Sequence, residues 1–116
     1  MLPGMGWNLD ARIPVSFAAT PGEGPPAAWV SEAPCPALPP GAVVAASFGG
    51  GAQHVAGCAC CTGRSAAAQA LDRLFQARVR QGCAWFDRVV APPEDADALR
   101  AALKEDVMAA VRFRLA

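Results

Sequence analysis

Short apolar runs separated by glycine and proline predict several β-strands along this chain. Residues 42–48, Ala-Val-Val-Ala-Ala-Ser-Phe, form a continuous apolar run between glycines, which is typical of a strand buried on both faces. The run at residues 13–19 also suits a strand, although Pro14 restricts it to an edge or to the beginning of a strand. Further strands are predicted in residues 27–30 and 85–91, and a short one in residues 53–57.

Two segments have the apolar spacing of amphipathic helices. Between Arg64 and Arg80, apolar positions fall on one face and charged positions on the other. The apolar face comprises Ala67, Ala70, Leu71, Leu74, Phe75 and either Arg78 or Val79. A second helix is predicted to begin in residues 92–95, where two prolines precede two acids. Its predicted buried stripe is Ala96, Leu99, Leu103, Val107 and Ala110.

The alternation of strands and helices predicts one α/β domain over residues 1–116. Parallel strands joined by right-handed crossovers are the usual result of this order, so we expect a small three-layer sandwich with a mainly parallel sheet. Most of the 11 prolines fall in residues 1–41, which predicts a loop-rich N-terminal part. The regular part of the domain is then residues 42–116.

Charge and composition exclude several classes of partner. Ten basic and ten acidic residues balance, and only 17% of the chain is charged, so we expect neither a nucleic acid nor a membrane as a partner. No apolar stretch approaches the roughly 20 residues needed to cross a bilayer. Because the chain is 53% hydrophobic with no net charge, it favours self-association, and a homodimer is one expected state.

Five cysteines indicate the redox environment. The sequence begins Met-Leu-Pro-Gly-Met-Gly, without the basic start and apolar run of a secretory signal. An odd number of cysteines in such a chain argues against a disulfide framework, so a reducing cytoplasm is the expected location.

Three of these cysteines are the strongest candidates for function. Cys58, Cys60 and Cys61 lie within four residues, just before the predicted helix and next to Arg64. A helix N-terminus and a nearby arginine both favour the thiolate, which is the form that binds metals. Thiolates prefer soft ions such as zinc and copper(I), and a closed zinc site needs four ligands. The other cysteine and histidine candidates for the fourth ligand are, in order of preference, His54, Cys83 and Cys35.

The cysteine segment resembles a known family. Gly57-Cys58-Ala59-Cys60-Cys61, the arginine that follows, a helix and then Phe86-Asp87-Arg88-Val89-Val90 are similar in order and spacing to the CobW-type family of P-loop GTPases and metallochaperones. The resemblance covers roughly the last 60 residues well and the first 50 only faintly. It implies a shortened P-loop NTPase-like fold, a metal-binding role for Cys58, Cys60 and Cys61, and a protein partner in metal transfer.

The chain departs from that family where nucleotide would bind. In the family, an Ile-Pro-Val strand leads into a phosphate-binding loop that ends in Gly-Lys-Thr. Here Ile13-Pro14-Val15 leads into a segment, residues 20–26, that contains three prolines and Glu23, and the only lysine is Lys104. Prolines lack the amide donors that hold phosphate, and a glutamate repels it. We therefore expect no bound nucleotide and no enzymatic hydrolysis.

Two other interpretations remain open from the sequence. The chain could be a non-catalytic module for dimerisation or partner binding, with cysteines that only pack, because free cysteine behaves as a small hydrophobic residue. It could also be a thiol redox protein. In that case Cys58 would pair with Cys60 or Cys61, since adjacent cysteines form only a strained disulfide.

Overall fold

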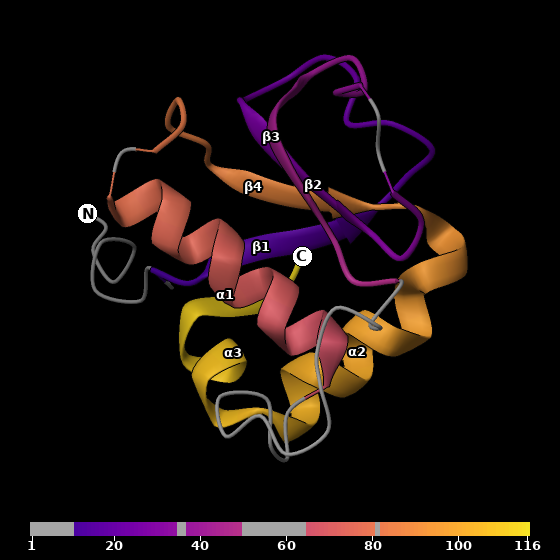
Figure 1. Cartoon of the computed structure of the whole chain (residues 1–116), viewed down its shortest axis with the longest axis vertical. Helices are drawn as coiled ribbons and strands as arrows, with labels where there is room; N and C mark the ends of the chain where they lie inside the picture. Colours follow the sequence, from indigo (N-terminus) through magenta and orange to yellow (C-terminus); the bar gives the residue numbers. More distant parts are fainter. Residues whose placement is uncertain (1–10, 35–36, 50–64, 81) are drawn as a thin grey trace, which may run out of the picture.

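The computed structural model describes residues 11–34, 37–49, 65–80 and 82–116 (Figure 1). It confirms the predicted fold class, because the described part is an α/β fold with a five-stranded, all-parallel sheet in the order β3-β2-β4-β1-β5. The strands are β1 (Ile13–Phe17), β2 (Ala27–Ser31), β3 (Ala42–Ser47), β4 (Arg88–Ala91) and β5 (Phe113–Leu115). The helices are α1 (Ala66–Val79), the 3-10 helix η3 (Pro93–Asp95), α2 (Ala96–Glu105) and α3 (Val107–Arg112). None of the described helices is both long enough and apolar enough to cross a bilayer.

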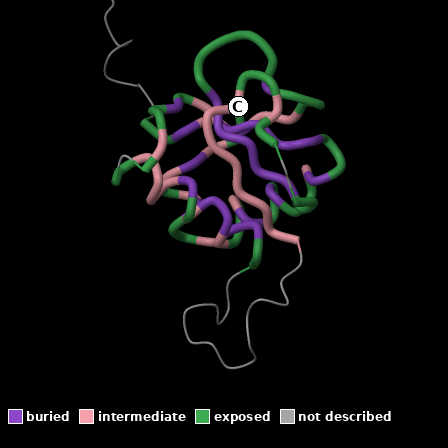
Figure 2. The backbone as a smooth tube through the Cα atoms, turned by 45° about the horizontal axis from the view of Figure 1, so that its top comes forward, coloured by how far each residue is buried: buried purple, intermediate pink, exposed green. Residues whose placement is uncertain are grey.

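The main hydrophobic core lies between the sheet and its helices. Alternate residues of the strands, such as Val15, Val30 and Val89, pack with Leu71 of α1 and Leu99 of α2, and all five are almost fully buried. Strand residues alternate between the two faces, so a second set points the other way. That set forms a smaller cluster of Ala27, Trp29 and Val90, with Ala42 and Ala45 at its margin. In Figure 2 the buried stretches lie mostly in the interior of the described backbone, and the exposed loops lie toward its outside.

The two halves of the chain cross the sheet on opposite faces. From β3 to β4 and from β4 to β5 the chain moves in one direction across the sheet, with α1, α2 and α3 on the core face. From β1 to β2 and β3 it moves the other way, so right-handed crossovers require the opposite face. Arg88 confirms this, because its side chain points away from the core and its Nε donates to the Pro25 carbonyl at 2.9 Å. Helices α1, α2 and α3 therefore cover one face of the sheet, and on the other, the coil face, the proline-containing coil of residues 21–25 lies against Arg88.

The order of the strands corrects one expectation about burial and agrees with the expected place of Pro14. The apolar run at residues 42–48 was expected to be buried on both faces, but β3 is an edge strand whose residues are all only half-buried. The strand buried throughout is β2, which lies between β3 and β4. β1 is also an interior strand, and Pro14 is tolerated there because it precedes Val15, the first β1 residue paired with β4.

The C-terminal segment differs from the single helix that was predicted. Asp106 ends α2, and its Oδ1 accepts a hydrogen bond from the Ala109 amide at 3.0 Å, which caps a new helix, α3. The break changes which face is buried, so Ala109 is fully buried and Val107, expected in the buried stripe, is 75% exposed. The residues that follow α3 form the strand β5.

Candidate functional site

The predicted metal ligands Cys58, Cys60, Cys61 and His54 lie in residues 50–64, outside the described residues. The structure describes the two ends of this segment. On one side, the Gly49 amide donates to the Glu32 carbonyl at 2.7 Å, just beyond the C-terminal end of β3. On the other side, Ser65 caps α1, and its Oγ accepts from the Ala68 amide at 3.1 Å. The cysteine segment thus connects the carboxyl edge of the sheet to the N-terminus of α1.

Cys83 is described, and it lies at the opposite end of α1 from Ser65. α1 has 14 residues, which makes it about 21 Å long. The Cys83 thiol is free and half-buried, and it packs against the hydrophobic core. Its role as a fourth ligand stays a prediction, and it would require the cysteine segment to run back along α1. Within the described residues, no group of three or more histidine, cysteine, aspartate or glutamate side chains could hold a metal ion.

The carboxyl ends of β1 and β4 form a switch point in the sheet. These strands are neighbours, but the chain leaves β1 over the coil face and leaves β4 over the helical face. Ligands of open α/β sheets bind in the crevice at such a point. A hollow of about 360 Å³ lies here. It is lined by Ala19, Trp29, Ser31, Ala33, Pro34, Pro92, Pro93 and Glu94.

The chemistry of this hollow does not suit phosphate. Asp95, which is 7% exposed, accepts a hydrogen bond from the Glu32 amide at 2.9 Å, and this bond joins the loops that follow β2 and β4. Glu94 lines the hollow directly, and among the described residues no basic side chain does. The Glu94 carboxylate would repel an anion held in the hollow, so a neutral or cationic group fits this position better.

Several backbone groups of the segment that follows β1 are engaged in hydrogen bonds within the fold. It runs as coil, and the Ala18 amide donates to the Ala91 carbonyl at 2.9 Å. The Gly22 amide donates to the Pro40 carbonyl at 3.2 Å. The carbonyls of Pro21 and Pro25 accept hydrogen bonds from Arg88. A phosphate-binding loop needs several free amides pointing at one position, whereas the hydrogen bonds of this segment serve to fix its own path.

Sequence analysis missed the role of Arg78, which joins α1 to the segment that leads into β4. Its guanidinium carbon lies 3.7 Å from the centre of the Trp85 ring, and its Nε donates to the Phe86 carbonyl at 2.9 Å. Desolvation lowers the pKa of Arg78, and the nearby charge of Asp87 opposes this shift by raising it. The position of residue 78 at the border of the apolar face was the available signal, because such a position suits a long side chain with an apolar stem.

Comparisons with known proteins provide no family assignment. No family model, curated protein or solved structure matches this chain. The resemblance to the CobW-type family therefore remains a hypothesis carried by the cysteine segment and the residues that follow it.

Proposed function

We propose that this protein is a non-catalytic metal-binding protein that holds zinc or another soft transition metal through Cys58, Cys60 and Cys61. The observation that carries the proposal is three cysteines in four residues, at positions 58–61, shortly before the Ser65-capped start of α1. The positive end of the α1 dipole favours thiolates in the preceding segment. Thiolate sulfur fits a soft cation, and three close ligands with a readily exchanged fourth suit metal transfer or homeostasis.

His54 and Cys83 complete the proposed set of ligands as alternatives. His54 is preferred because it lies only four residues before Cys58, whereas Cys83 lies beyond the far end of α1. We propose a cytoplasmic location, because reduced thiols persist in that compartment. The three prolines and Glu23 in the coil after β1 support a role without nucleotide hydrolysis, and delivery to a protein partner is the activity that the CobW-type resemblance implies.

Metal analysis tests this proposal directly. Protein purified without chelators or metal-affinity resin is expected to carry about one equivalent of metal. The triple Cys58→Ser/Cys60→Ser/Cys61→Ser variant is expected to carry almost none, whereas the matched Cys83→Ala variant keeps the metal if His54 is the fourth ligand. The proposal fails if the natural protein binds less than about a tenth of an equivalent and added zinc does not protect its thiols from alkylation.

Thiol titration separates metal binding from the redox alternative. Mild oxidation of a redox protein should remove two of the five thiols, because one disulfide consumes two of them. A count that stays at five after oxidation, in metal-free protein, excludes the redox interpretation.

A second candidate function, partner binding, is favoured by the exposed surface of α3. Val107, Met108 and Val111 are 75%, 42% and 61% exposed, and they lie on one helix of six residues. Clustered exposed apolar side chains often mark an interface. If this surface forms a homodimer, sedimentation should show a dimer that Val111→Glu converts to a monomer. A natural protein that stays monomeric at high concentration contradicts this candidate without affecting the metal proposal.

A further inference from the structure

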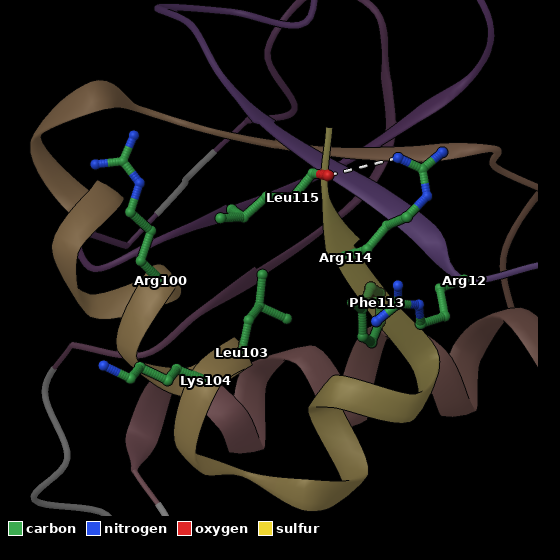
Figure 3. A pocket seen from close by; sticks show the side chains of 7 residues that line it. All are labelled: Arg12, Arg100, Leu103, Lys104, Phe113, Arg114 and Leu115. Atoms are coloured by element: carbon green, nitrogen blue, oxygen red, sulfur yellow. Dashed lines mark hydrogen bonds between the residues drawn. The ribbon is translucent and has the colours of Figure 1, made fainter. Parts of the chain in front are cut away.

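A groove at the edge of the sheet combines apolar and cationic side chains. It lies between the terminal strand β5 and helix α2, and has a volume of about 330 Å³ (Figure 3). Its apolar lining is Leu103, Phe113 and Leu115, and its cationic lining is Arg12, Arg100, Lys104 and Arg114. An adjoining hollow of about 300 Å³ shares Arg100 and Leu115 and extends the groove toward the end of β1.

The outer edge of β5 has backbone groups available for another strand. β5 pairs with β1 on one side only. On that side, the Ala116 amide donates to the Val15 carbonyl at 2.9 Å. Backbone groups alternate in direction along a strand, so the amide and carbonyl of Leu115 point to the outer edge. Among the described groups, only the Arg114 side chain reaches that carbonyl, at 3.4 Å.

The charge of the groove limits what can bind there. Four of the ten basic residues line it, and no acidic side chain of the described residues does. Arg100 and Lys104 are exposed and one helical turn apart on α2, and within the described part of the chain neither forms an ion pair. In Figure 3 they lie on one side of Leu115, and Arg114 and Arg12 lie on the other. A second copy pairing through β5 would bring these cations together, which costs free energy.

We infer that this groove binds an extended, acidic peptide segment of a partner protein, which adds a sixth strand to the sheet beside β5. Peptides bind open sheet edges in this way, with main-chain hydrogen bonds for affinity and side-chain contacts for specificity. Carboxylates of the segment would pair with Arg100 and Lys104, and alternate apolar side chains would pack on Leu103 and Leu115. This inference does not depend on the cysteines, so its failure would not affect the proposed metal site, and failure of the metal site would not affect this inference.

The opposing explanation is that the cations protect the edge. Charged side chains on an edge strand prevent it from pairing with other chains. If protection is their only role, no peptide should bind in the groove, whatever its charge.

Fluorescence anisotropy with designed peptides decides between these explanations. The probes are fluorescein-labelled octapeptides that alternate glutamate with valine, leucine or phenylalanine, and matched peptides with lysine in place of glutamate. We expect at least one acidic peptide to bind about tenfold or more tightly than its lysine counterpart. An Arg100→Gln/Lys104→Gln variant should lose about tenfold in affinity, whereas Arg80→Gln, at the exposed arginine that follows α1, should leave it nearly unchanged.

Backbone methylation tests whether the peptide forms a strand. N-methylation of the residues that face β5 removes their donors, so it should abolish binding, and bound peptide should slow hydrogen exchange at the Leu115 amide. The inference is overturned if no acidic peptide binds, if lysine peptides bind equally well, if Arg80→Gln weakens binding as much as the double variant, or if methylated peptides bind unchanged. Metal content is expected to be the same in Arg100→Gln/Lys104→Gln as in the natural protein.

Discussion

Replacing Arg78 with methionine tests how the segment between α1 and β4 is held. Methionine keeps much of the apolar stem but removes the hydrogen bond to the Phe86 carbonyl and the cation over Trp85. A hydrogen bond from a charged donor contributes about 1.5 kcal/mol, at the low end of its range for a half-buried group. The contact with Trp85, which is 56% exposed, adds about 0.5 kcal/mol. We therefore expect Arg78→Met to lower the free energy of unfolding by about 2 kcal/mol.

Urea denaturation followed by circular dichroism measures this loss. With a slope of about 2 kcal/mol per molar urea, the midpoint should fall by about 1 M. Arg80→Met is the matched control, because Arg80 is exposed at the end of the same helix, and its midpoint should hardly move.

A double-mutant cycle isolates the contact between the two side chains. Combining Arg78→Met with Trp85→Ala should reveal a coupling of about 0.5 kcal/mol, which is the part of the loss that needs both partners. If Arg78→Met lowers the free energy of unfolding no more than the Arg80→Met control does, the reasoning is refuted. If the losses of Arg78→Met and Trp85→Ala are strictly additive, the stacking contribution is refuted.

Two further substitutions test the hydrogen bond between Glu32 and Asp95, beside the hollow at the carboxyl ends of β1 and β4, and the cap of α1 after the cysteine segment. Asp95→Ala leaves the Glu32 amide without its partner and should lower the free energy of unfolding by about 2 kcal/mol. The control Asp97→Ala, on the exposed face of α2, should change it by less than about 0.5 kcal/mol. Equal losses for the two variants would contradict the role of the hydrogen bond. Ser65→Ala removes the cap of α1 and should cost about 1 kcal/mol, and Ser65→Asp should restore most of it. Thermal or urea unfolding measures both, and a Ser65→Asp variant as unstable as Ser65→Ala would show that capping is not the reason.

The elements with strong local signals could be predicted from the sequence. α1 was predicted as residues 64–80 and observed as Ala66–Val79, because its apolar stripe is regular and sustained over several turns. The position of β1 followed from its apolar run, and the fold class followed from the alternation of strands and helices. These properties depend on residues close together in the sequence.

Properties set by distant residues could not be predicted. Apolar runs do not reveal which strands lie in the middle of a sheet, so β3 was expected to be buried on both faces although it is an edge strand. The break between α2 and α3 depends on whether the Asp106 side chain caps a new helix or lies on the surface of a continuous one. An aspartate suits both positions, so the residue type does not decide between them. The cysteine cluster was found from spacing alone. The groove beside β5 was missed because Arg12, Arg100 and Arg114 are far apart in sequence and meet only through the strand order.

The position of β4 between β1 and β2 has a consequence for the order of folding. Both neighbours of β1 in the sheet, β4 and β5, lie in residues 88–116. During synthesis β1 therefore cannot pair with either strand until most of the chain has left the ribosome. β2 and β3 can pair early, but two strands alone are only marginally stable in water. Completion of the sheet is therefore a late event, and premature release of the chain before residue 88 would leave the first three strands without a lasting structure and prone to aggregate.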